Sequence, residues 1–239
     1  MLLTVKNLSM NFGKLIALDD VSFEVATGEV FGIAGPNGAG KTTLFNVISG
    51  HYRGKGSISF DGEEIQNLRS QQICHRGIAR IFQIPTIFSS MTIYQNVKFG
   101  AHFGNRHRDV SEEDTIAEIL RLTGLEGKEN IPAKNTDLFT KKITMLAAAL
   151  ATRPKLILLD EPIGGLNPGE IDQFLTLIRR IRVELGVTAM VIEHLMEYLM
   201  ELSDRLMILD FGKEIAIGTP SEVAKDKKVI EIYLGGVGA

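Results

Sequence analysis

Most of the chain consists of short apolar runs that end at glycine or at a polar residue. Four compact runs have the length of buried strands, at residues 30–34, 78–82, 156–159 and 188–192. Residues 206–209 make another. Between several of these runs, apolar residues recur at helical spacing. We therefore predict an α/β fold with a mainly parallel sheet and flanking helices.

The helix that follows the run at 156–159 has a full set of boundary signals. Asn167 can cap it, Pro168 occupies its first position and Glu170 completes a capping box. Gly186 can end it. Its apolar residues fall on one face, at Ile171, Phe174, Leu175, Ile178, Ile181 and Leu185.

The first sixty residues follow a different pattern. Short apolar stretches within residues 1–30 are separated by turn residues at 11–13 and 27–28, and Ser57–Phe60 precedes an Asp-Gly turn. This pattern is typical of antiparallel strands. An N-terminal antiparallel β-subdomain is therefore expected beside the α/β core.

Residues from about 84 to 150 change character again, with two prolines and amphipathic helical segments. The segment from Ser111 to Gly124 carries a cap residue at each end and apolar residues on one face. A second helix is expected from Ile143 to Ala151. We predict a helical subdomain inserted into the α/β core of a single domain, residues 1–239.

Two potential metal-binding or reactive groups are not assigned such a role. His102 and His107 lie in a basic stretch that no cysteine or acidic cluster joins, so a solvated loop is favoured over a metal site. Cys74 is the only cysteine, which excludes an internal disulfide and indicates a reducing compartment. A bystander thiol is its expected role.

Composition narrows the possible functions. With 239 residues, 44% of them hydrophobic, the chain can form a packed core, and a formal net charge of −3 argues against nonspecific nucleic-acid binding. The first residues lack the apolar stretch of a signal peptide, and no apolar run approaches a membrane span. A soluble cytoplasmic protein is expected, which a partner would have to bring to a membrane.

The first compact strand leads into a glycine-rich segment and then into an unbroken apolar run, a pattern that predicts strand, loop and helix. The segment is Gly35, Pro36, Asn37, Gly38, Ala39, Gly40, Lys41, Thr42 and Thr43. Its G-x4-G-K-T spacing is that of a phosphate-binding loop. Glycines let backbone N–H groups point at an anion, Lys41 supplies charge to the β- and γ-phosphates, and the Thr42 hydroxyl can bind Mg²⁺. The expected ligand is ATP with Mg²⁺.

Each compact strand ends in a polar group, at Gly35, Gln83, Asp160-Glu161 and Glu193-His194. Ligands of open parallel sheets bind outside the carboxyl ends of the strands, so these groups are expected to face one crevice. There Asp160 can hold the Mg²⁺ shell, Glu161 can polarise a water and Gln83 can reach the metal or that water. His194 can contact the γ-phosphate. This combination predicts ATP hydrolysis.

Together these motifs resemble the nucleotide-binding subunit of ABC transporters over essentially the whole chain. Gly35–Thr43 resembles its Walker A motif, Leu156–Asp160 its Walker B motif and Gln83 its Q-loop. The resemblance implies that Glu161 is the catalytic glutamate and that residues 164–167 form the D-loop.

The resemblance also implies that His194 is the switch histidine and that Phe12 is the aromatic residue of the A-loop, which would stack on the nucleotide base. From its place in a predicted turn alone, Phe12 is equally well an ordinary packing residue. A closer resemblance, to subunits of branched-chain amino-acid importers, is carried by residues 78–83, 165–168 and 229–235. The related urea and amide importers share these stretches.

One family motif is altered. ABC subunits carry L-S-G-G-Q about twenty residues before the Walker B aspartate, at a helix N-terminus that closes over the γ-phosphate bound by the partner subunit. Here the corresponding stretch is Thr136–Lys142, which covers the ungapped alignment and one shifted by two residues, and it contains no glycine. Phe139 would obstruct close approach, and Asp137 would place a carboxylate near phosphate. Lys141 and Lys142 would offset part of that repulsion, or they form a solvated helix start.

The expected function is therefore that of the cytosolic ATPase subunit of an ABC importer for branched-chain or similar amino acids. The resemblance implies a heterodimer with a second nucleotide-binding subunit. It also implies permease subunits docked on the helical subdomain, which would hold the chain at the inner face of the cell membrane. Two alternatives stay open: a regulatory ABC ATPase without a transport role, and a subunit with little turnover because of the altered Thr136–Lys142.

Overall fold

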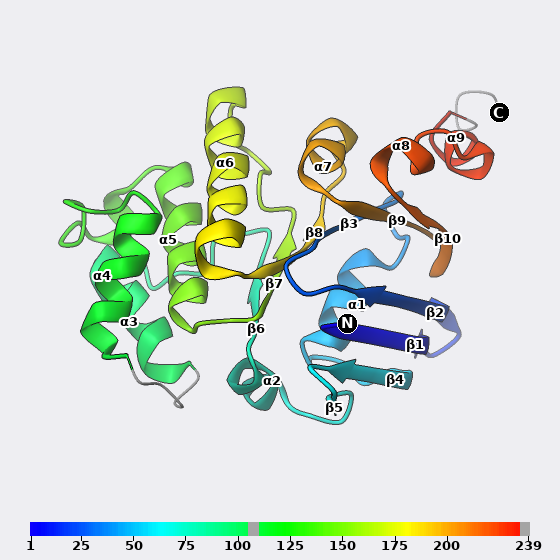
Figure 1. Ribbon diagram of the computed structural model, residues 1–239, viewed down its shortest axis with the longest axis horizontal. Coiled ribbons are helices and arrows are strands. Elements are labelled where there is room, and N and C mark those ends of the chain that lie inside the picture. Colours follow the sequence, from blue (N-terminus) through cyan, green and yellow to red (C-terminus); the bar gives the residue numbers. More distant parts are fainter. Residues whose placement is uncertain (105–109, 235–239) are drawn as a thin grey trace. The chain divides into compact units, whose positions relative to one another are not determined.

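The chain divides into two compact units, which are described separately (Figure 1). The computed structural model describes residues 1–104 and 110–234. The first unit combines residues 1–70 with residues 188–239, and the second unit comprises residues 71–187. The chain therefore leaves the first unit after residue 70 and returns to it at residue 188.

The first unit contains a four-stranded antiparallel sheet in the order β2-β1-β4-β5. Its strands are β1 (Leu3–Phe12), β2 (Leu15–Val25), β4 (Lys55–Phe60) and β5 (Glu63–Glu64). The N-terminal antiparallel subdomain is thereby confirmed. The turn predicted at 11–13 is displaced: β1 continues through Phe12, which pairs with Leu15, and the turn consists of Gly13 and Lys14. Gly13 has a φ of 61°, a conformation that glycine adopts readily in such short hairpins.

The other strands of the first unit pair in the order β10-β9-β3-β8. They are β3 (Val30–Ala34), β8 (Thr188–Ile192), β9 (Arg205–Asp210) and β10 (Lys213–Gly218). β3 runs parallel to β8 and β9, and every residue of β3 and β8 is buried, which explains their continuous apolar sequence. The helices of this unit are α1 (Lys41–Ile48), α7 (Met196–Leu202), α8 (Pro220–Val223) and α9 (Lys227–Leu234).

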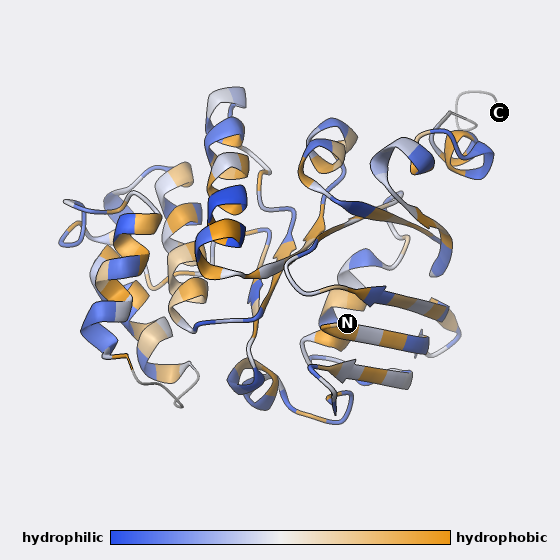
Figure 2. Ribbon diagram, in the orientation of Figure 1, coloured by the Kyte–Doolittle hydropathy of each residue, from blue (hydrophilic) through white to orange (hydrophobic). Residues whose placement is uncertain are grey.

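The second unit combines two parallel strands with a group of helices. The strands are β6 (Ile78–Ile81) and β7 (Leu156–Asp160). The helices are α2 (Ser70–Arg76), α3 (Ile93–Phe103), α4 (Glu112–Leu122), η1 (Ala133–Asn135), α5 (Leu138–Ala151) and α6 (Pro168–Leu185). α3, α4 and α5 pack against one another. Figure 2 shows apolar and polar residues alternating around α3 and α4, as expected for amphipathic helices.

Side-chain caps set several helix boundaries. Asn167 forms the predicted capping box with Glu170, and Gly186, with a φ of 65°, ends α6. The Ser111 hydroxyl caps α4, as predicted. The helix predicted from Ile143 begins five residues earlier, at Leu138, because the Asp137 side chain caps it there.

The basic stretch with two histidines is described only in part. His102 Nδ1 lies 3.1 Å from Glu112 Oε2, and His107 lies outside the described residues. Within residues 1–104 and 110–234, no three His, Cys, Asp or Glu side chains are arranged to hold a metal ion. None of the helices in the described part of the chain is long and apolar enough to cross a membrane.

Candidate functional site

The glycine-rich segment joins β3 to α1 in the first unit. Gly35, Gly38 and Gly40 have φ angles of 149°, 83° and 103°, a region that residues with a Cβ rarely adopt. A Cβ on Gly35 would also lie 2.0 Å from the carbonyl oxygen of Leu209. The path of this loop therefore requires glycine at these positions.

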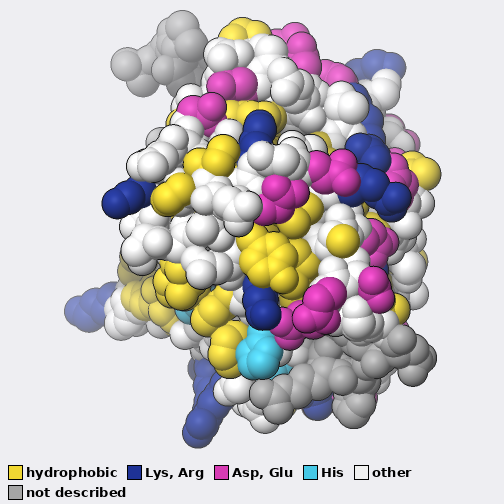
Figure 3. Space-filling model, turned by 90° about the vertical axis from the view of Figure 1, so that its left-hand side faces the viewer, with side chains coloured by type: hydrophobic (Ala, Val, Ile, Leu, Met, Phe, Trp, Pro, Cys, Tyr) yellow, Lys and Arg dark blue, Asp and Glu magenta, His cyan; other side chains and the backbone are white. Residues whose placement is uncertain are grey.

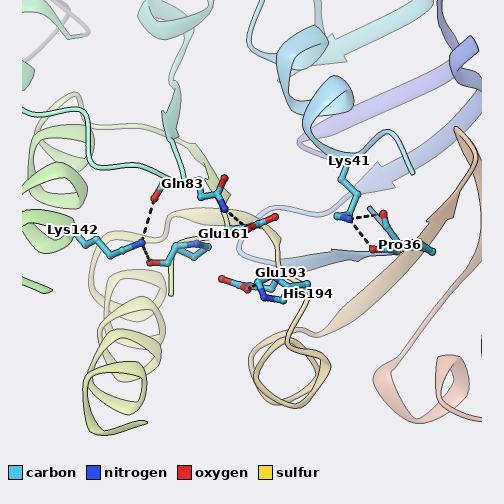
Figure 4. A network of polar contacts seen from close by, with 9 residues as sticks. Pro36, Lys41, Gln83, Lys142, Glu161, Glu193 and His194 are labelled. Carbon is cyan, nitrogen blue, oxygen red and sulfur yellow. Dashed lines mark hydrogen bonds and ion pairs between the residues drawn. The ribbon is translucent and has the colours of Figure 1, made fainter. Parts of the chain in front are cut away.

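α1 begins at Lys41, so Lys41, Thr42 and Thr43 form its first turn and not the end of the loop. The Lys41 side chain is buried, and its Nζ donates to the carbonyl oxygens of Gly35 at 2.7 Å and Pro36 at 3.0 Å (Figure 4). The backbone N–H groups of a helix N-terminus attract anions. Loop, helix end and ammonium group thus combine into a site suited to phosphate.

Two of the predicted catalytic residues are in contact in the second unit. Gln83 follows β6, and its Nε2 donates to Glu161 Oε2 at 2.6 Å (Figure 4). Glu161 directly follows β7 and has a φ of 47°, a left-handed conformation that costs a non-glycine residue about 1–3 kcal/mol. Strain of this kind concentrates at functional sites. The sequence indicated that Gln83 reaches the metal or a water, and it gave no sign of this direct contact with Glu161.

Asp160 has a buried partner that sequence reasoning missed. Its Oδ2 lies 2.9 Å from Nη2 of Arg80, and the two side chains are 7% and 6% exposed. The Arg80 guanidinium also lies over the Phe82 ring, 4.7 Å from its centroid. A signal was present, because Arg80 is a charged residue inside an apolar strand, and buried charges need partners.

α5 contributes a buried lysine to the same unit. Lys142 Nζ donates to the carbonyl oxygen of Pro162 at 2.8 Å and to that of Gln83 at 3.4 Å (Figure 4). Lys142 therefore joins the backbone of Gln83 to the segment that directly follows Glu161. The interpretation of Lys141 and Lys142 as a solvated helix start is wrong for Lys142, because that side chain is buried.

The N-terminus of α5 carries its own carboxylate. Asp137 Oδ1 accepts a hydrogen bond of 2.6 Å from the backbone N–H of Thr140. This hydrogen bond, helped by one with the Thr140 side chain, holds the pKa of Asp137 below its usual value, and Lys128 and Lys141 act in the same direction. A negative charge therefore occupies the N-terminal end of α5.

Phe12 and His194 are accessible in the first unit. Phe12 is 43% exposed, and its ring meets Tyr52 edge-on with centroids 5.2 Å apart. His194 follows the buried strand β8, and its side chain is 53% exposed, with Nδ1 3.8 Å from Glu193 Oε2. Both rings are thus able to contact a ligand.

Comparison with known families and sequences agrees with this arrangement of motifs. A family model described as ABC transporter matches residues 18–164, and one described as branched-chain amino acid ATP-binding cassette transporter matches residues 213–239. The chain is 35% identical to the high-affinity branched-chain amino acid transport ATP-binding protein BraF of Pseudomonas aeruginosa. It is 34% identical to the corresponding protein LivG of Escherichia coli. Each alignment covers 98% of both proteins.

Solved structures give the same result. A nucleotide-free ATP-binding cassette from an ABC transporter matches with a TM-score of 0.87 at 31% identity, over 98% of this chain and 99% of that one. Another cassette, in its ADP conformation, matches with a TM-score of 0.88 at 31% identity, over 98% of both chains. The α/β fold expected for a P-loop ATPase is confirmed. The chain therefore belongs to the ABC transporter family, as an ATP-binding cassette with the ATPase activity of that family.

Proposed function

We propose that the protein is the ATP-hydrolysing subunit of an importer for branched-chain or related amino acids. The proposed substrate class rests on the similarity of the whole chain to relatives named as branched-chain amino acid transport ATP-binding proteins. The match of residues 213–239 to the branched-chain family model supports the same substrate class. The chain's own residues support the energy source, because a phosphate loop and an acidic pair at a strand end are the parts that ATP hydrolysis needs.

ATP binds through the loop Gly35–Thr43. Backbone N–H groups of the loop and of the first turn of α1 hold the phosphates, and Lys41 adds a full charge. Phe12 stacks on the base, a role that its exposed ring supports.

Mg²⁺ suits the donor set of these motifs. Asp160 provides a carboxylate, Thr42 a hydroxyl and Gln83 an amide oxygen, and Mg²⁺ prefers such hard oxygen ligands. When bound, Mg²⁺ would neutralise charge that develops on the β- and γ-phosphates.

Hydrolysis relies on Glu161 as general base. Its carboxylate takes a proton from the water that attacks the γ-phosphorus, and ADP leaves. The hydrogen bond from Gln83 fixes the direction of that carboxylate. His194 contacts the γ-phosphate and responds to its departure, which its exposed side chain allows.

A permease docks on exposed aromatic residues of the second unit. Phe88, Phe99 and Phe103, here termed the α3 aromatic cluster, are 42–51% exposed, and their neighbouring ring centroids lie 4.8 and 4.5 Å apart. Figure 3 views the side of the molecule that carries α3 and shows apolar side chains gathered among charged ones. Aromatic groups exposed together are typical of protein interaction sites. This contact would place the subunit at the inner face of the membrane.

The docking proposal is tested with the double variant Phe99→Ser, Phe103→Ser. We expect co-purification with the permease to be lost while ATP affinity of the isolated chain stays unchanged. Val183→Ser is the matched control, since Val183 is exposed on α6 of the same unit. If the double variant still binds the permease, the permease docks on a different surface.

The transport function is tested by reconstitution in vesicles with the permeases, the second ATPase subunit and the binding protein of the same gene neighbourhood. We expect leucine, isoleucine or valine, together with the binding protein, to stimulate ATP hydrolysis. Stimulation by urea or an amide alone would reassign the substrate. A rate of ATP hydrolysis that does not depend on the permeases would favour a regulatory ABC ATPase instead.

A further inference from the structure

Arg80 and Asp160 place opposite charges side by side in the interior of the second unit. They lie on adjacent parallel strands, with Arg80 opposite Leu158 on β7. Nη2 and Oδ2 are 2.9 Å apart, and both side chains are less than one-tenth exposed. The Phe82 ring covers the guanidinium, 4.7 Å from its centroid. Strand pairing, ion pair and ring contact together fix this guanidinium in place.

A buried carboxylate is unstable without a positive partner, because burial removes its hydration. Mg²⁺ can supply that charge only while it is bound, whereas Arg80 supplies it permanently. The two cations do not compete for one position, since a carboxylate has two oxygens and about four lone-pair sites. The ion pair through Oδ2 leaves Asp160 the capacity to bind a second cation.

We propose that Arg80 is the resident counter-ion of Asp160, which neutralises and orients this carboxylate before the divalent cation arrives. Arg80 is a positioning residue, because it acts on the metal only through Asp160. The inference rests on the proposed function in one respect, the assignment of Asp160 to the Mg²⁺ site. An ion pair with a purely architectural role would make no difference to the response of the protein to Mg²⁺.

The test compares thermal unfolding of the nucleotide-free full chain in a chelator and in millimolar Mg²⁺. In the chelator, Arg80→Met should lower the melting temperature by on the order of 10 °C, because it leaves a buried charge unpaired. Mg²⁺ should then raise the melting temperature of Arg80→Met by several degrees more than that of the wild type, since binding to the folded state stabilises it. If Arg80→Met does not fold, the same comparison is made with Arg80→Gln, which also removes the charge.

Three variants separate this role from general destabilisation. Arg80→Lys retains the charge and should show no enhanced Mg²⁺ response. Adding Asp160→Asn to Arg80→Met should abolish that response, because the carboxylate is gone. Arg153→Met breaks another ion pair of the same unit, with Glu118, and its loss of stability should not be recovered by Mg²⁺.

Nucleotide binding gives a second measurement. By calorimetry, the gain in ATP affinity that Mg²⁺ confers should be about tenfold larger in Arg80→Met than in the wild type, because Mg²⁺ then supplies the missing positive partner of the Asp160 carboxylate. Equal Mg²⁺ responses of Arg80→Met and wild type in both measurements would overturn the role of Arg80. Unchanged Mg-ATP affinity in Asp160→Asn alone would instead overturn the assignment of Asp160 to the metal site.

Discussion

At the scale of single residues, the chemistry is concentrated in a few side chains that the fold holds in unusual positions. Lys41 is buried, and its Nζ donates to the carbonyl oxygens of its own loop. Glu161 has a left-handed backbone and accepts a hydrogen bond from Gln83. In the proposed mechanism Lys41 serves ATP binding and Glu161 serves hydrolysis, so we expect their variants to behave differently.

Lys41→Ala should weaken ATP binding strongly, because the variant loses charge-assisted contacts with two phosphates. One such contact contributes about 1.5–3 kcal/mol, which corresponds to a loss of affinity of roughly 10- to 150-fold. Calorimetry on the isolated chain measures this change in ATP affinity. Lys14→Ala, at an exposed turn of the same unit, is the control and should bind as the wild type does. Equal ATP affinities for Lys41→Ala and wild type would show that Lys41 does not contact the phosphates.

Glu161→Gln should bind ATP normally but hydrolyse it on the order of 10²–10⁴ times more slowly, because the amide has the same shape and cannot accept the proton. It should also favour an ATP-bound dimer. Single-turnover hydrolysis with the proper partner measures the effect, and Glu184→Gln on the exposed face of α6 is the control. A variant that turns over at the wild-type rate would show that Glu161 is not the base.

At the scale of elements, the strands and the cap of α6 could be predicted from the sequence, whereas the partners of the buried charged residues could not. The α6 capping box and the apolar run of β3 depend on neighbouring residues, so the sequence alone specifies them. Arg80 and Lys142 find their partners 80 and 20 residues away, at Asp160 and Pro162, and only the folded chain brings these together. The start of α5 differs from the predicted one because Asp137 caps the helix at Leu138, a local signal that the absence of a glycine motif in this stretch does not reveal.

Asp137→Ala should destabilise α5 by about 1 kcal/mol at neutral pH, the usual effect of losing an N-cap. The lowered pKa of Asp137 gives this contribution a pH dependence. The folded state favours the ionised carboxyl, so the stabilisation is complete above the usual pKa and is lost as the pH falls through the lowered pKa of the folded state. Denaturant unfolding of wild type and variant should therefore converge as the pH drops below about 4. A difference that is constant with pH would contradict an electrostatic cap.

At the scale of the whole molecule, the altered α5 terminus makes this chain an incomplete ATPase in our account. In a homodimer, each phosphate loop would face a partner's Thr136–Lys142, where Asp137 already provides a carboxylate for the helix end. Losing one preorganised donor to the transition state typically costs about 10²–10³ in rate. The isolated chain should therefore be nearly inactive, and activity should need a different subunit with an intact signature motif.

The most direct test of this account is ATP hydrolysis by a heterodimer in which the catalytic glutamates are changed one at a time. Glu161→Gln should abolish most turnover, because the site built on this chain's Lys41 and Glu161 is the one completed by the partner's signature motif. The equivalent change in the partner should leave much of the turnover, because its site faces the altered Thr136–Lys142. Equal losses from the two changes, or vigorous hydrolysis by the isolated chain, would contradict the account.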